Sequence, residues 1–227
     1  MKRIYLLLIA GALFVAASLP VAHARSNGRV DEILASMQRA ASKITTLQAT
    51  LRQETRNADL GGPPETSGGQ VFFKHVGPKA DRVRITYSVP AGRVVVVNEK
   101  QIFLYEKSTN QCFETTRSSL ASKNQEFSFF ATPYSLSSTE MKARYEIVYV
   151  KDDGGTEVLE LTPKSQSSVK KMKWWVDKAS WLPIKTEMTE KNNEITTFTL
   201  TGTSVNAKGF TGSFDNPCPK GSERIIR

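Results

Sequence analysis

The sequence predicts a mainly β protein of the α+β class: one domain built on a long, curled antiparallel sheet with a few helices. Apolar residues recur with a period of two through most of the chain, which is typical of strands with one buried face. Turn segments rich in glycine and proline separate these short stretches, and few helical patterns intervene. Consecutive strands are therefore expected to pair as an antiparallel meander.

The N-terminus has the pattern of a cleavable signal peptide. Two basic residues precede an apolar run from Ile4 to Leu19, and Ala22 and Ala24 supply the small residues before a cleavage point. The run is short for a membrane-spanning helix, and no cysteine follows the cut. We predict a signal peptide over residues 1–24, a mature domain over 25–227, and a soluble periplasmic product.

The charge of the chain is mildly basic and spread along its length. The formal net charge is +9, and signal cleavage would lower it to +7 by removing two of the 31 basic residues. Such an excess of positive charge favours binding to anionic lipid headgroups or to an acidic partner. An exported protein does not meet nucleic acid, so nucleic acid is not an expected partner. We expect a monomer.

Two helices are expected. The first follows the signal peptide, because six apolar residues recur at intervals of three and four, with Ser26 or Asn27 as its cap. These six residues are Val30, Ile33, Leu34, Met37, Ala41 and Ile44. A second, short helix is predicted from Thr132 to about Lys142, since threonine followed by Pro133 is a favoured helix start.

Eleven strands are predicted from the alternating pattern. They cover residues 47–51, 70–76, 82–89, 93–98, 101–106, 111–116, 145–150, 157–162, 169–177, 183–190 and 194–202. Successive side chains of a strand point to opposite faces of the sheet. The adjacent Trp174 and Trp175 are therefore expected on opposite faces, with Trp174 pointing inward.

Cys112 and Cys218 are the only cysteines of the chain. An oxidising compartment permits a disulfide between them, and the even count leaves no thiol over. Two buried free thiols are the alternative, because the sequence does not determine how close the two Cα atoms come.

The sequence offers little for catalysis. After signal cleavage His75 is the only histidine, so a multi-histidine metal site is excluded, and no cysteine pair has metal-ligand spacing. Asp152 and Asp153 precede two glycines in an expected hairpin turn, where solvated aspartates are usual. We therefore predict no catalytic residue, no metal and no cofactor. A hydrolase with an unrecognised site and a membrane-inserted barrel remain alternatives, although the aromatic girdles of such a barrel are missing.

One face of the predicted sheet is consistently apolar. Its residues are Val83, Ile85, Tyr87, Val95, Val97, Leu159, Leu161, Met172, Trp174 and Val176. A plain hydrophobic core and a ligand cavity fit this pattern equally well. The aromatic segment Phe127–Tyr134 and the first helix could both act as lids, which favours a cavity.

Seven segments of the chain carry a resemblance to a known family. They are Thr46–Gln53, Gly69–Lys74, Arg82–Ser88 with Pro90, Gln101–Tyr105, Thr132–Tyr134, Leu161–Lys164 and Phe210–Gly221. In order and spacing they resemble the LolA family of periplasmic outer-membrane lipoprotein carriers, the last being similar to the family's closing aromatic strand followed by a proline-glycine segment. The resemblance extends over essentially the whole mature chain.

The resemblance implies an incomplete antiparallel β-barrel with an α-helical lid enclosing an apolar cavity. Proteins of this family take acylated lipoproteins from an inner-membrane release complex to an outer-membrane receptor. The residues expected to line the acyl-chain cavity are Leu51, Val83, Ile85, Tyr87, Val95, Val97, Phe103, Tyr105, Phe129, Phe130, Leu159, Leu161, Met172, Trp174 and Val176. A related protein that binds or senses lipid or glycolipid is the alternative.

The resemblance also implies a latch between lid and barrel. Where the family places an arginine followed by proline, this chain has Lys79 and Ala80. Lysine lacks the planar fork of donors that arginine offers. Lys79, Arg82 and Arg84 are therefore the candidates for the latch.

Overall fold

The computed structural model describes residues 21–77, 81–117, 136–210 and 212–226. Its helices are α1 (Val21–Ala41) and α4 (Ser138–Arg144), and its strands are β1 (Thr46–Asn57), β2 (Glu65–His75), β3 (Asp81–Val89), β4 (Ala91–Val97), β5 (Gln101–Glu106), β6 (Gln111–Thr116), β7 (Tyr145–Asp153), β8 (Thr156–Pro163), β9 (Val169–Asp177), β10 (Pro183–Glu190), β11 (Glu194–Val205) and β12 (Glu223–Ile226). All eleven predicted strands are present, and β5, β6, β9 and β10 have the predicted bounds.

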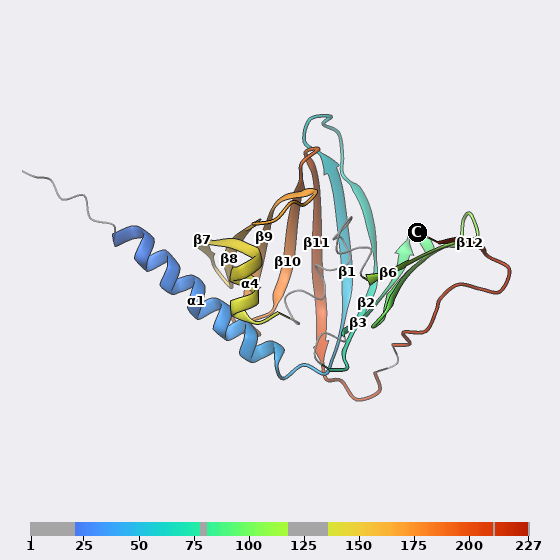
Figure 1. Cartoon of the computed structure of the whole chain (residues 1–227), viewed down its shortest axis with the longest axis horizontal. Helices are drawn as coiled ribbons and strands as arrows, with labels where there is room; N and C mark the ends of the chain where they lie inside the picture. Colours follow the sequence, from blue (N-terminus) through green and yellow to red (C-terminus); the bar gives the residue numbers. More distant parts are fainter. Residues whose placement is uncertain (1–20, 78–80, 118–135, 211, 227) are drawn as a thin grey trace, which may run out of the picture.

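The twelve strands form one sheet, in the order β12-β6-β5-β4-β3-β2-β1-β11-β10-β9-β8-β7. Neighbouring strands run antiparallel except β12 and β6, which are parallel. Figure 1 shows that the sheet bends strongly, with β7 and β12 as its two edges, so the barrel is incomplete. The predicted fold class is confirmed. The short parallel β12 was not predicted, because its four residues carry no clear alternation.

Irregular strand pairing accompanies the bend of the sheet. The register shifts between Gln48 and Thr50 where β1 pairs with β11, and between Gly68 and Gly69 where β2 pairs with β3. At Gly69 a Cβ atom would lie 2.0 Å from the backbone oxygen of Thr86, so glycine is needed for this close approach of two backbones. Bulges increase the local twist of a sheet, which suits a curled sheet.

The pairing register assigns each side chain to one of two faces. Leu159 pairs with Trp174, Trp174 with Thr186, Thr186 with Phe198, and Phe198 with Gln53. Directly paired residues of antiparallel strands point to the same side. We call the side that carries this row the inner face and the opposite side the outer face.

Helix α1 begins earlier than the sequence pattern indicated. The predicted caps Ser26 and Asn27 lie inside the helix, which starts at Val21. Residues 21–25 include the strong helix formers Ala22 and Ala24 and contain neither glycine nor proline, so the helix extends upstream to Val21 on their own propensity. The predicted N-cap is therefore wrong, and the helix also spans the expected cleavage point.

Helix α4 begins later than expected. Ser137 is its N-cap: the Ser137 hydroxyl accepts from the backbone N–H of Glu140, and the Glu140 carboxylate accepts from the backbone N–H of Ser137. This capping box satisfies two donors that no helical turn could reach, so it determines where the helix starts. The predicted start at Thr132 lies outside the described residues, but Leu136 and Ser137 are not helical. The prediction of one helix from Thr132 to Lys142 is thus wrong in its extent.

The segment before β12 forms an irregular strap on the outer face. The resemblance implied a closing aromatic strand from Phe210, followed by a proline-glycine segment. Among the described residues of 207–222 none is in a strand, so the closing strand is not present there. Pro217 and Pro219 have no N–H to donate to a ladder, which suits an irregular strap. Cys218 of the strap is bonded to Cys112 of β6, with Cα atoms 5.8 Å apart, and this confirms the disulfide.

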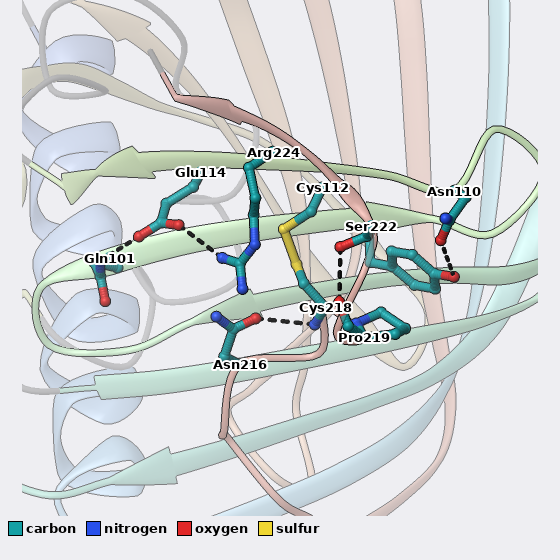
Figure 2. Close-up of a disulfide and its surroundings, with 10 residues drawn as sticks. Gln101, Asn110, Cys112, Glu114, Asn216, Cys218, Pro219, Ser222 and Arg224 are labelled. Atoms are coloured by element: carbon teal, nitrogen blue, oxygen red, sulfur yellow. Dashed lines mark hydrogen bonds and ion pairs between the residues drawn. A yellow bond between two sulfur atoms is a disulfide. The ribbon is translucent and has the colours of Figure 1, made fainter.

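Side chains around the disulfide attach the end of the chain to the sheet (Figure 2). The Arg224 guanidinium donates to the Glu114 carboxylate at 3.0 Å, and the Gln101 amide donates to the other oxygen of the same group. Near the sulfurs, the backbone N–H of Cys218 donates to the Asn216 side chain at 2.9 Å. The disulfide thus holds the strap to β6, and the ion pair of Arg224 with Glu114 holds β12 to the same strand.

The disulfide should stabilise the fold substantially, because it closes a loop with a sequence separation of 106 residues. We expect Cys112→Ser/Cys218→Ser to lower the free energy of unfolding by about 2–4 kcal/mol in urea titrations. Reductant should lower the stability of the wild type by a similar amount and leave the double variant unchanged. Equal stability of the oxidised wild type and the variant would contradict the prediction.

Candidate functional site

The inner face carries two large apolar clusters, which together include eleven of the predicted cavity residues. The first apolar cluster spans β1–β5 and β11 and includes Leu51, Val83, Ile85, Tyr87, Val95 and Val97. The second apolar cluster spans β7–β10 and both helices and includes Leu159, Leu161, Met172, Trp174 and Val176. None of these side chains is more than 7% exposed. The sequence therefore placed these eleven residues correctly on one apolar face.

The helices cover the second apolar cluster. Ile33 and Leu34 of α1 and Met141 of α4 pack into it. Polar contacts join the two helices: the Lys142 ammonium pairs with Asp31, and the Gln38 side chain accepts from the hydroxyl and backbone N–H of Ser138. The two helices therefore form a joint cover over one half of the inner face, as Figure 1 shows for their position beside β7 and β8.

Phe103 and Tyr105 do not belong to the inner face, and their assignment to the cavity is wrong. Phe103 is buried with Cys112 and Phe214 in a third cluster beneath the strap. Tyr105 points to the same side, two residues along β5, and its hydroxyl contacts Asn110 at 3.3 Å. The sequence marked both residues as apolar strand residues, but both faces of β5 are partly buried because the strap covers the outer one.

Two of the three candidate latch residues, Arg82 and Arg84, lie where the outer face meets the strap. Arg82 forms an ion pair with Glu99 across the sheet, and its Nε donates at 2.7 Å. Arg84 donates to the backbone oxygen of Ser213 in the strap at 3.3 Å, and burial lowers the pKa of its guanidinium. Both residues are engaged with partners other than a helix. Lys79, like the lid candidates Phe129 and Phe130, lies outside the described residues.

A buried charge holds the N-terminal half of α1 to the sheet. Glu157 of β8 is fully buried, and its carboxylate accepts from the Arg29 guanidinium of α1. Lys178 lies 3.9 Å from the same carboxylate. A buried carboxylate is costly unless it is paired, and the Arg29 guanidinium of the helix is its closest cationic partner. This pair carries no signal in the sequence, because 128 residues separate its members.

The inner face becomes polar along the length of β1. Leu47, Ala49 and Leu51 are followed on the same face by Gln53 and Thr55. The Tyr87 hydroxyl donates to the Gln53 amide oxygen at 2.9 Å, and the Thr55 hydroxyl contacts that of Thr196 at 3.3 Å. The row of apolar side chains that runs along β1 from Leu47, which we call the apolar lane, therefore ends at a row of hydrogen-bonded polar side chains that begins with Gln53.

Acidic residues lie beyond this polar row. Glu190 and Glu194 stand at the facing ends of β10 and β11, on the inner side. Burial and then the neighbouring Glu194 carboxylate raise the pKa of Glu190. This end of the inner face is thus both polar and negatively charged.

Some inner-face residues were missed by sequence reasoning. Val71, Phe73 and Phe198 belong to the first apolar cluster, and the alternation of their own strands could have found them. Leu182 belongs to it as well, although it lies in the turn before β10 where no periodicity exists. Contacts made by turns are decided by tertiary structure.

Other kinds of site were sought in the described ranges. No group of three or more histidine, cysteine, aspartate or glutamate side chains there could hold a metal ion. No helix within those ranges is long and apolar enough to cross a membrane. The inner face is therefore the main candidate site.

A curled antiparallel sheet with helices over part of an apolar face defines the class of fold to which this chain belongs. Residues 42–215 match the family model of the outer membrane lipoprotein carrier protein LolA. The match covers well over half of the chain, and the protein belongs to the LolA family. No curated protein matches the chain.

Solved structures share the fold at low sequence identity. A structure of MucB superposes with a TM-score of 0.53 and 14% identity, over 88% of this chain and 66% of MucB. An uncharacterised conserved protein from Thermus thermophilus gives 0.51 and 15%, over 88% and 99%. The lipoprotein LppX of Mycobacterium tuberculosis gives 0.46 and 13%, over 81% and 100%. At such identities the likeness is one of fold alone.

The Arg29–Glu157 contact predicts a specific mutational pattern. Arg29→Ala should lower the free energy of unfolding by about 3 kcal/mol, because it leaves a buried carboxylate without its main partner. Arg29→Met/Glu157→Leu should recover most of that loss, since neither charge remains. Glu32→Gln, which removes the exposed partner of Arg29, should change stability by about 0.5 kcal/mol or less. Urea unfolding followed by circular dichroism measures all three, and a double variant no more stable than Arg29→Ala would contradict this account.

Proposed function

We propose that this protein carries lipoproteins through the periplasm from the inner to the outer membrane, shielding their acyl chains on its inner face. The single observation that carries the proposal is the apolar inner face. Its buried residues form the first apolar cluster on β1–β5 and β11 and the second on β7–β10 and the two helices. Membership of the LolA family supports it. A release complex in the inner membrane and a receptor in the outer membrane are its proposed partners.

The physical need for such a carrier follows from the hydrophobic effect. Each buried methylene contributes roughly 0.8 kcal/mol, so an acyl chain does not leave a membrane for water at a useful rate. An apolar face that replaces the membrane removes most of this cost. The cargo must also leave again, so the cover formed by α1 and α4 is proposed to move. The cover is attached by apolar packing and a few polar contacts rather than by strand pairing, which suits such movement.

The proposal is tested directly by a release assay. Purified protein is incubated with spheroplasts whose inner membrane is loaded with lipoproteins, and lipoproteins in the supernatant are measured. We expect release above that of a buffer control, and absence of release would overturn the carrier role. Mass spectrometry of what co-purifies separates the alternative: free lipid or glycolipid without acylated protein would favour a lipid-binding or lipid-sensing role.

The two adjacent tryptophans report on the site of binding. Trp174 is fully buried on the inner face, whereas Trp175 lies on the outer face with the Lys185 ammonium 4.2 Å from its ring centre. Trp181 is first replaced by Phe, so that the fluorescence comes from Trp174 and Trp175. An acyl ligand should alter the fluorescence of Trp174, which is the part lost in Trp174→Phe. It should leave the fluorescence of Trp175, the part lost in Trp175→Phe, unaltered. The reverse result would place the ligand on the outer face.

A further inference from the structure

One end of the inner face opens into a hollow that we call the mouth. It lies where α1 ends, β1 and β10 begin and β11 ends, at the lower edge of the sheet in Figure 1. Its volume is about 510 Å³, and its walls come from Ser36–Ile44, Ala179–Leu182 and Val205–Asn206. A second hollow of about 310 Å³ shares Ser180, Leu182 and Val205 with it. Volumes of this size are typical of sites for small ligands.

The mouth is continuous with the apolar inner face. Ile44 and Leu182 line the mouth and are also members of the first apolar cluster, 4% and 5% exposed. From Leu47 to Gln53 the apolar lane along β1 is about 20 Å long, at the usual rise of an antiparallel strand. One leaflet of a bilayer core is about 15 Å thick. The lane is therefore long enough for one acyl chain that enters from the mouth.

Two cations stand at the rim of the mouth, and no carboxylate is found among the described residues that line it. Arg39 and Lys43 are exposed, and neither pairs with an acidic residue in the described part of the chain. The Arg39 guanidinium donates to the neutral Ser36 hydroxyl at 2.9 Å. In the adjoining hollow Asp177 is the charged group, and its carboxylate already accepts from the hydroxyl and the backbone N–H of Ser180. The rim therefore has positive charge available for a ligand.

The rim is held in a defined shape. The Asn206 side-chain oxygen accepts from the backbone N–H groups of Thr45 and Thr46, and its amide donates to the Lys43 carbonyl at 2.7 Å. Across the mouth Trp181 has a φ of +56°, in the left-handed region that non-glycine residues rarely adopt. Bulky residues retain such a conformation only where surrounding contacts impose it, commonly at ligand sites.

The opposite end of the inner face has the opposite character. The polar row that begins at Gln53 and the acidic pair Glu190 and Glu194 close the apolar lane there. An anionic group would be repelled at that end and attracted at the mouth. Charge thus distinguishes the two ends of the lane.

From these observations we infer that the mouth binds the phosphate-bearing, anionic polar end of an acyl lipid through Arg39 and Lys43, while the acyl chain lies on the inner face and points toward Leu51. The inference rests on the proposed acyl-chain binding and adds the class of polar group and its direction. Charge-assisted hydrogen bonds from the guanidinium and the ammonium supply the recognition.

The test compares two lipids with the same chain. Oleoyl lysophosphatidylglycerol is anionic and oleoyl lysophosphatidylcholine is zwitterionic, and both are titrated calorimetrically below their micelle concentrations. We expect the anionic lipid to bind the full-length mature protein about tenfold more tightly, as for a net gain of one hydrogen bond to a charged group. Raising the ionic strength from about 0.02 M to about 0.5 M should reduce this preference. Equal binding of the two lipids would overturn the inference and leave acyl-chain binding intact.

Matched variants assign the effect to the mouth. Arg39→Gln/Lys43→Gln should lose the preference for the anionic lipid and keep the affinity for the zwitterionic one. Lys170→Gln/Lys220→Gln removes two other exposed cations that do not line the mouth, so it should retain the preference. An equal loss in both variants would mean that net charge, not the mouth, selects the lipid.

Two further arms complete the test. Inorganic phosphate alone should bind at least tenfold more weakly than the anionic lipid; if it binds as tightly, the chain contributes nothing and the inference fails.

In NMR spectra, stearoyl lysophosphatidylglycerol with a doxyl label at carbon 5 should broaden the amides of Ile44 and Leu182, and a label at carbon 16 should broaden that of Leu51. The opposite pattern would reverse the direction of the chain. If neither lipid binds the wild type, acyl-chain binding itself is overturned.

Discussion

The structure depends on one constraint: an open, curled sheet of twelve strands has an apolar face that must be kept from water. Strand pairing satisfies the backbone, but it leaves the side chains of the inner face to be covered by something else. Helices α1 and α4 cover the second apolar cluster, and the strap covers part of the outer face. The two covers are attached differently. A disulfide fixes the strap to β6, whereas packing and a few polar contacts hold α1 and α4 on the inner face.

This difference in attachment relates structure to function. The strap contains the disulfide, which fixes it to the sheet. The α1–α4 cover is joined to the sheet by apolar packing on the second apolar cluster and by the ion pair of Arg29 with Glu157, without strand pairing. The proposed carrier role needs such a division, because its site must be apolar enough to hold a chain and accessible enough to release it. Polarity along β1, with the cations of the mouth at one end and glutamates at the other, makes the two ends of the inner face different.

Most of the sheet could be predicted from local pattern, and the errors have physical causes. The alternation of apolar and polar residues places a strand correctly wherever one face is buried and the other solvated, as in β9 and β10. It fails at β5, where the strap buries Phe103 on the outer face, because alternation cannot tell which of two covered faces is the inner one. Helix ends were also misplaced: α1 continued past Ser26 on the propensity of its alanines, and α4 began at the Ser137 capping box. Caps depend on local hydrogen bonds that several serines in a row could equally have made.

By itself the sequence determined the class of fold, eleven strands, the apolar character of the inner face and the opposite directions of Trp174 and Trp175, because these follow from the two-residue period of a strand. Tertiary structure alone decided the bond between Cys112 and Cys218, the buried contact of Arg29 with Glu157, and the meeting of Arg39, Lys43, Trp181 and Leu182 around one mouth. These residues lie far apart along the chain. Their proximity is a product of how the sheet curls, which no short stretch of sequence specifies.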